Sequence, residues 1–107
     1  MSPGPGSAAE RRRHDRYTVG EPAILRIIGV KGGVYLITVI DVSKSGLRLS
    51  CSVSLAPGTR VEVRWRGARI EGEVRYAREV QAHEFHLGMA ADVGEDQDLT
   101  LLYRPRG

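Results

Sequence analysis

The sequence predicts an all-β fold: a small six-stranded antiparallel β-barrel (a split barrel) with a short C-terminal helix and a flexible, arginine-rich loop at the N-terminus. Three observations support this prediction. The chain has 107 residues, which fits a single domain. About six short segments are rich in β-branched residues or alternate apolar with polar residues, and turn signals separate them. No long helical pattern lies between these segments, which argues against parallel strand–helix–strand units.

The first elements follow from composition and from glycine placement. Residues 1–9 contain only Met, Ser, Pro, Gly and Ala and are expected to form a disordered leader, so that the single domain spans 10–104. Residues 23–28 form the first apolar strand of the prediction. Residues 30–33 contain the two glycines of a hairpin connection. The stretch 34–42 is rich in β-branched and aliphatic residues, as buried strands are.

The later segments show the alternation that is typical of half-buried strands. Turn residues at 56–58 and 66–67 separate two pairs of them. Residues 95–103 are expected to form the short helix, with Leu99 and Leu102 turned inward. The alternation predicts the following inward side chains: Leu47, Leu49, Cys51, Val61, Val63, Trp65, Ile70, Val74, Tyr76, Phe85, Leu87 and Met89.

Most of the basic residues are arginine, although the chain as a whole is only weakly basic. The net charge is +3, and 14 of the 16 basic residues are arginine. The guanidinium fork matches phosphate and the Hoogsteen edge of guanine, although genomic base composition explains such a bias equally well. A net charge of +3 is too small to indicate bulk nucleic-acid binding, so the positions of the arginines carry the information.

The cysteine count and the apolar runs limit the class of protein. Cys51 is the single cysteine and cannot form an internal disulfide. No Cys/His cluster has zinc spacing, so neither a metal nor a cofactor is expected. The longest nearly apolar run, 34–42, is too short to cross a bilayer, and the N-terminus lacks the apolar stretch of a signal peptide. We therefore expect a cytoplasmic protein with no membrane span.

The first segment that suggests chemistry is the run Arg-Arg-Arg-His-Asp-Arg at 11–16, before the first strand. Arg12 and Arg16 are spaced four apart, and two guanidiniums at that spacing can close around one anion. In a flexible leader they would become ordered by the ligand. A solvated basic stretch that keeps the terminus soluble explains the same residues.

The second segment is Asp-Val-Ser-Lys-Ser-Gly at 41–46. Asp41 offers acceptors and Ser43 offers both a donor and acceptors, a combination that suits the N1–H and N2–H₂ edge of guanine. Gly46 would permit a positive φ and a close approach of the backbone. A turn between two strands with no ligand explains this segment as well. Strand alternation places Asp41 and Ser43 on one face, and on the opposite face Leu36, Thr38, Ile40 and Val42.

The two segments together resemble the PilZ domain family. In that family an Arg-x-x-x-Arg loop and an (Asp/Asn)-x-Ser-x-x-Gly turn lie on a six-stranded barrel and bind the bacterial second messenger cyclic di-GMP. Both motifs are complete in this chain. The run Phe-His-Leu-Gly-Met at 85–89 is similar to the last strand of the family, and the short C-terminal helix is similar too. The resemblance therefore covers about residues 11–103.

The resemblance implies a role for each residue of the two motifs. Arg12 and Arg16 would contact the phosphates and the guanine Hoogsteen edges, partly by stacking. Asp41 and Ser43 would hydrogen-bond a guanine, and Gly46 would shape the turn.

Further expectations concern stoichiometry and signalling. Arg11 occupies the position before the motif, where an arginine in this family accompanies a stacked pair of ligand molecules. The chain would then be a receptor and adaptor: the ligand would order residues 10–17, and an unidentified effector protein would recognise the ordered form.

Three alternatives remain open. An enzyme is disfavoured because His14, His83 and His86 lack a nucleophile-and-base arrangement, while Cys51 falls in a buried alternation. A single-stranded nucleic-acid-binding barrel would use the arginines between 48 and 78, but glutamates interrupt them, so no DNA partner is expected. A degenerate PilZ-like protein-interaction module would keep the barrel without the ligand, and the complete motifs argue against it.

Overall fold

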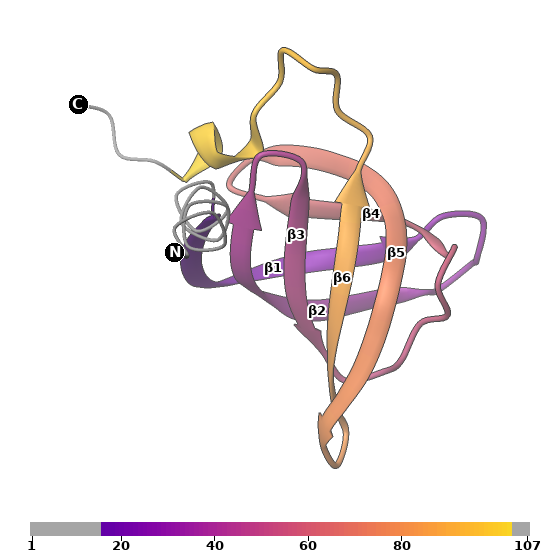
Figure 1. Ribbon diagram of the computed structural model, residues 1–107. Coiled ribbons are helices and arrows are strands. Elements are labelled where there is room, and N and C mark those ends of the chain that lie inside the picture. The colour runs from indigo at the N-terminus through magenta and orange to yellow at the C-terminus, as the bar shows by residue number, and fades with distance from the viewer. Residues whose placement is uncertain (1–15, 104–107) are drawn as a thin grey trace, which may run out of the picture.

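The computed structural model describes residues 16–103. Within this range six antiparallel strands close into a barrel in the order β1-β2-β3-β6-β5-β4 (Figure 1). This confirms the predicted six-stranded antiparallel architecture. The leader at 1–9, together with Arg11 and Arg12, lies outside the described residues. The elements are β1 (Arg16–Ile27), β2 (Val34–Ser43), β3 (Gly46–Cys51), β4 (Arg60–Trp65), β5 (Ala68–Gln81), β6 (Glu84–Ala91) and the 3-10 helix η1 (Leu99–Leu102).

Strand β1 begins earlier than the pattern at 23–28 predicts. Arg16 is its first residue, so this arginine belongs to the sheet rather than to the preceding loop. The pairing of β1 with β2 shifts register between Thr18 and Glu21, and Gly20 lies there with φ of +72°. A bulge of this kind breaks the strict alternation of a strand. The first part of β1 therefore could not be recognised from periodicity.

The interior of the barrel is filled with aliphatic side chains, as expected for a barrel of this size. Most of the predicted inward positions on β3, β4, β5 and β6 are buried, including Trp65 and the free thiol of Cys51. Phe85 is partly buried against the core. The fully covered apolar side chains are Leu25, Val39, Val42, Leu49, Val61, Val63, Val74 and Leu87.

A bulge on β2 makes the predicted division of that strand into two faces wrong. Leu36 is 76% exposed, whereas Ile37, Val39 and Val42 are buried. The pairing with β3 shifts register between Val39 and Asp41, so the alternation changes parity there. Leu36 and Val42 therefore do not share a face.

A third bulge, on β5, moves Tyr76 to the outside of the barrel. The pairing of β5 with β6 shifts register between Val74 and Tyr76. Val74 is fully buried as predicted, but Tyr76 is half-exposed, so its inward assignment was wrong. Beyond this point β5 and β6 continue as a long hairpin that projects from the barrel (Figure 1).

The C-terminal helix is a single 3-10 turn, shorter than the 95–103 segment of the prediction. Asp98 caps it, because its carboxylate accepts a hydrogen bond from the Thr100 backbone N–H at 2.9 Å. Leu99 is buried, as expected, and Leu102 is partly buried. Within 16–103 no helix is long and apolar enough to cross a membrane.

Hydrogen bonds to Glu21 connect the first half of β1 to the turn between β4 and β5. Glu21 accepts hydrogen bonds from the Trp65 indole N–H at 2.8 Å and from two guanidinium nitrogens of Arg66, each at 2.8 Å. These bonds, from Arg66 first and then from Trp65, lower the pKa of Glu21 from 4.5 to about 2. The ring of Tyr103 lies 6.4 Å from that of Tyr17 and 6.4 Å from that of Trp65, between centroids.

Candidate functional site

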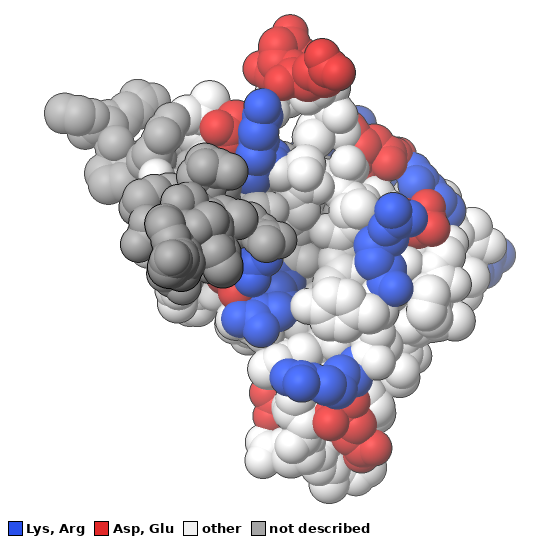
Figure 2. Space-filling model, viewed as in Figure 1, with Lys and Arg blue, Asp and Glu red and all other residues white. Residues whose placement is uncertain are grey.

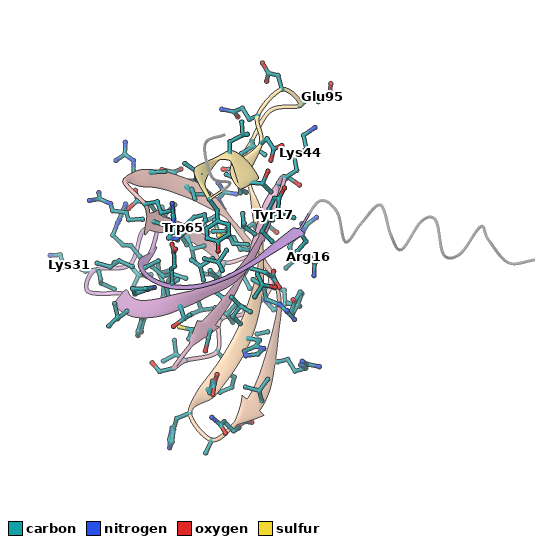
Figure 3. The ribbon with its side chains drawn as sticks, turned by 90° about the vertical axis from the view of Figure 1, so that its left-hand side faces the viewer. Arg16, Tyr17, Lys31, Lys44, Trp65 and Glu95 are labelled. Atoms are coloured by element: carbon teal, nitrogen blue, oxygen red, sulfur yellow. The ribbon has the colours of Figure 1, made fainter. Side chains whose placement is uncertain are left out.

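Antiparallel pairing of β1 with β2 brings the two motifs of the sequence together. Arg16 lies directly opposite Ser43, and Thr18 lies opposite Asp41. Figure 3 shows Arg16 and Lys44 toward the same end of the molecule, while Lys31, in the β1–β2 connection, lies at the other end. The start of β1 and the bend after β2 are therefore neighbours on one side of the barrel.

A shallow pocket of about 230 Å³ lies at this junction. Four of the predicted residues line it: Arg16, Asp41, Ser43 and Gly46. Figure 2, in the view of Figure 1, shows Lys and Arg side chains beside β3 and over β5 on this face of the molecule. The other two predicted residues, Arg11 and Arg12, lie outside the described range, and the structure assigns them no position.

Eight further residues of the pocket were not predicted as site residues, and four of them determine its charge and shape. These four are Arg48 on β3, Arg75 and Tyr76 on β5, and Gly88 on β6. The sequence shows Arg48 and Arg75 only as members of a scattered set of arginines. Tyr76 was assigned to the interior, because the bulge that precedes it cannot be recognised from the alternation. The run at 85–89 contains Gly88, but nothing in that run indicates that it faces a pocket.

Asp41 is held by an ion pair inside this pocket. Its side chain is 7% exposed, and its Oδ2 atom accepts hydrogen bonds from Arg48 Nη2 at 2.6 Å and from Arg48 Nε at 3.0 Å. The two residues lie opposite each other in the pairing of β2 with β3. Arg48 thus neutralises a carboxylate that would otherwise be buried without a counter-charge.

Gly46 is required by a close backbone approach. A Cβ atom at this position would lie 2.8 Å from the Met89 carbonyl oxygen on the neighbouring strand β6. Gly46 is not among the described glycines with positive φ, so the expectation of a positive φ was wrong and that of a close approach was right. Next to it, the Ser43 hydroxyl donates a hydrogen bond to the Gly46 carbonyl at 3.4 Å.

Two distant elements hold the turn that carries the second motif. The Ser45 carbonyl accepts a hydrogen bond from the Ala91 backbone N–H at 2.9 Å. The Lys44 carbonyl accepts one from the Leu99 backbone N–H, also at 2.9 Å. The turn between β2 and β3 is therefore fixed by the end of β6 and by the start of η1.

An aromatic ring forms part of the pocket wall. Tyr76 lies so close to Gly88 that a Cβ atom on this glycine would be 2.0 Å from the tyrosine ring. Any larger residue at position 88 would displace the ring. The half-exposed ring therefore rests on the β6 backbone, next to the three arginines of the pocket.

The pocket combines several positive charges with one carboxylate, and such groups can bind an anion. Three guanidiniums, from Arg16, Arg48 and Arg75, share it with the single carboxylate of Asp41. Arg75 also contacts Glu73, with 3.5 Å between Nη1 and Oε2. In the described part of the chain no group of three His, Cys, Asp or Glu side chains gathers to hold a metal ion.

Comparison with family models identifies the family of the chain. A family model described as the PilZ domain matches residues 10–104, which is most of the chain. A search of curated proteins finds no match. The family match agrees with the resemblance drawn from the two motifs. The chain therefore belongs to the PilZ domain family, a family of cyclic di-GMP-binding adaptor domains.

Proposed function

We propose that this protein is a receptor for cyclic di-GMP that binds its ligand in the pocket at the start of β1 and passes the signal to an effector protein in the cytoplasm. The observation that carries the proposal is the pairing of Arg16 with Ser43. It brings the last arginine of one motif beside the turn of the other, in a pocket that also contains Asp41 and Gly46.

The ligand and the pocket are complementary in charge and in hydrogen bonding. Cyclic di-GMP carries two phosphate charges and two guanines. Arg16, together with Arg12, supplies guanidinium donors for phosphate and for the Hoogsteen edge of guanine. Asp41 and Ser43 supply acceptors for the N1–H and N2–H₂ edge.

Two more residues extend the site beyond the motifs. The half-exposed ring of Tyr76 offers a flat face on which a guanine can stack, an interaction that contributes about 1–3 kcal/mol per base. Arg75 offers a further guanidinium beside that ring. These groups suit a ligand with two purines and two phosphates better than a simple inorganic anion.

The signal would arise from the chain before Arg16. We propose that the ligand draws Arg11 and Arg12 onto the pocket and that the effector recognises the resulting surface of arginine and nucleotide. Arg16 and Tyr17 are already strand residues in the structure, so the ordering concerns residues 10–15 rather than 10–17. Arg11 would recruit the second member of a stacked ligand pair.

Calorimetric titration tests the site. The protein is titrated with cyclic di-GMP, cyclic di-AMP and GTP, alongside the variants Arg12→Ala, Arg16→Ala and Asp41→Ala. A charge-assisted contact contributes roughly 1.5–3 kcal/mol, so each variant should weaken cyclic di-GMP binding about 10- to 100-fold. The matched control is Arg64→Ala, because Arg64 is exposed on β4, outside the pocket. Undiminished binding in all three variants would refute the assignment.

Limited proteolysis tests the ordering step separately. Trypsin cleaves after arginine, so protection at Arg11, Arg12 and Arg13 reports directly on the segment before β1. We expect slower cleavage there when cyclic di-GMP is bound and no change with GTP. Equal cleavage with and without the ligand would contradict the ordering step while leaving the binding site intact.

A further inference from the structure

The outer face of the β1–β2 hairpin carries apolar side chains that the fold leaves uncovered. Leu36 is 76% exposed, and both Ile24 and Val34 are about half exposed. Ile24 lies directly opposite Leu36 in the strand pairing, and Val34 lies opposite Arg26. We call Ile24, Val34 and Leu36 the apolar strip. Contiguous exposed apolar side chains that are bordered by polar ones are typical of protein-binding surfaces.

Arginines border the apolar strip on its β4 side. Arg64 lies opposite Ile24, and Arg26 lies opposite Glu62, in the pairing of β1 with β4. Arg69, on the next strand, lies opposite Arg64. The three guanidinium-bearing side chains are 44–64% exposed, so they present charge to the solvent beside the strip.

The only carboxylate directly beneath these arginines in the described structure is buried. Glu62 is 2% exposed, and its oxygens lie 3.4 Å from Arg26 Nη2, 3.2 Å from Arg64 Nε and 3.6 Å from Arg69 Nε. The hydrogen bonds from Arg26 first, and then from Arg64, lower its pKa. Glu71, which is exposed and lies opposite Glu62 on β5, is the next carboxylate on this face, so Arg26, Arg64 and Arg69 exceed Glu62 and Glu71 by one positive charge.

A groove continues the apolar strip on the other side. It has a volume of about 420 Å³ and lies between the outer face of the β1–β2 hairpin, with Pro22, Leu36 and Thr38, and the β5–β6 hairpin tip at 81–84. One apolar side chain of a partner can enter it beside Leu36. The groove joins Leu36 to polar side chains from the end of β3 and from the β5–β6 tip, among them Ser50, Gln81 and Glu84. Arginines border the strip on the β4 side.

We propose that this surface docks an acidic amphipathic segment of a partner protein. The apolar side chains of this segment would cover the apolar strip and enter the groove. The carboxylates of the segment would face Arg26, Arg64 and Arg69. Charge complementarity selects this occupant. A second copy of the chain bound through the same surface is the competing occupant, and self-association of the protein is therefore one of the outcomes tested below.

The surface lies apart from the cyclic di-GMP pocket. Leu36 and Ser43 are seven residues apart on β2, which corresponds to about 23 Å along a strand. In Figure 1 β1 and β2 cross behind β6 and β5, the two strands that carry Gly88 and Tyr76 of the pocket. A partner held on the apolar strip would leave the pocket open, so this docking is independent of the proposed ligand.

The experiment is an NMR titration of the ¹⁵N-labelled protein with a synthetic amphipathic peptide. The peptide has leucines at i, i+3, i+4 and i+7 and glutamates elsewhere, and its matched control has lysine in place of every glutamate. We expect shifts centred on Ile24, Val34, Leu36 and Arg64 with the acidic peptide, decreasing as salt is added. The lysine peptide should produce none of them.

Variants separate the apolar strip from other exposed apolar residues. Leu36→Ser should weaken binding of the acidic peptide by about tenfold or more, and Arg64→Gln should weaken it and reduce its salt dependence. Leu101→Ser, at another exposed leucine, should leave it unchanged. Because Leu36 lies outside the core, a circular-dichroism melt should show that its variant still folds.

Three outcomes would overturn the proposal. The first is equal binding of the acidic and basic peptides, and the second is absence of shifts at the strip. The third is self-association of the protein in sedimentation equilibrium that Leu36→Ser abolishes, because it would identify a second copy of the chain as the occupant.

Discussion

Removing Arg48 should destabilise the protein before any ligand is involved. Arg48→Ala leaves the Asp41 carboxylate buried without its counter-charge. Breaking a buried ion pair in this way typically costs about 3–5 kcal/mol. The Arg48 side chain is 36% exposed, so solvent reaches the site and we expect about half of that loss, ~2 kcal/mol. For a domain of this size such a loss lowers Tm by about 8–16 °C.

A double-mutant cycle gives the sharpest form of this prediction. Asp41→Asn alone should cost less than about 1 kcal/mol, because the amide oxygen still accepts from Arg48. In the Arg48→Ala background the same substitution should instead be stabilising, because it removes the unpaired buried charge. The sign of the effect of Asp41→Asn therefore depends on whether Arg48 is present.

Urea denaturation measures all four members of the cycle, and an unchanged slope m shows that two-state unfolding is retained. The control is Arg75→Ala, because Arg75 lies in the same pocket but has a 63% exposed side chain, and its loss should change stability by less than about 0.5 kcal/mol. The reasoning is refuted if Asp41→Asn is equally destabilising in both backgrounds, or if Arg48→Ala is no more damaging than the control.

Three further predictions concern the turn between β2 and β3, the loss of folding stability at low pH, and the core. Gly46→Ala should destabilise by about 1–3 kcal/mol in urea denaturation, since the new methyl group meets the Met89 carbonyl at 2.8 Å; a stability equal to that of the wild type would contradict this. The pKa of Glu21 is about 2 in the folded protein against 4.5 when unperturbed, so its contribution is complete above about pH 4.5 and is lost as the pH falls toward 2. In thermal melts, the Tm of Glu21→Gln should therefore fall less than that of the wild type as the pH decreases from 4.5 toward 2. An equal fall in both proteins would contradict this prediction. Leu25→Ala should cost about 2–5 kcal/mol, because Leu25 is fully buried, and a smaller loss in urea would mean that the core closes around the cavity.

Alternation in the sequence predicted the barrel, because most strands have one covered and one open face. Leu47, Leu49, Val61 and Val63 all point inward as their spacing indicated. The predictions failed where a bulge changes which of the alternating side chains point inward, as at Tyr76. A bulge leaves no mark in a local pattern, because it depends on the register with the neighbouring strand.

The candidate site was predictable only in part, for a related reason. The motif residues Asp41, Ser43 and Gly46 are close in sequence and could be found by spacing. Arg48 could not be assigned as the partner of Asp41 without the register of β2 and β3. Glu62 looked like a solvated residue on the open face of β4, yet it is buried beneath arginines of three different strands.

The two backbone hydrogen bonds that hold the second motif have a consequence for binding thermodynamics. Because Lys44 and Ser45 are hydrogen-bonded to Leu99 and Ala91, the bend is pre-organised and would lose little conformational entropy on binding the proposed nucleotide. The entropic penalty of recognition would then fall on the arginines that precede β1. A deletion that removes η1 should accordingly weaken nucleotide affinity, although η1 itself contributes no side chain to the pocket.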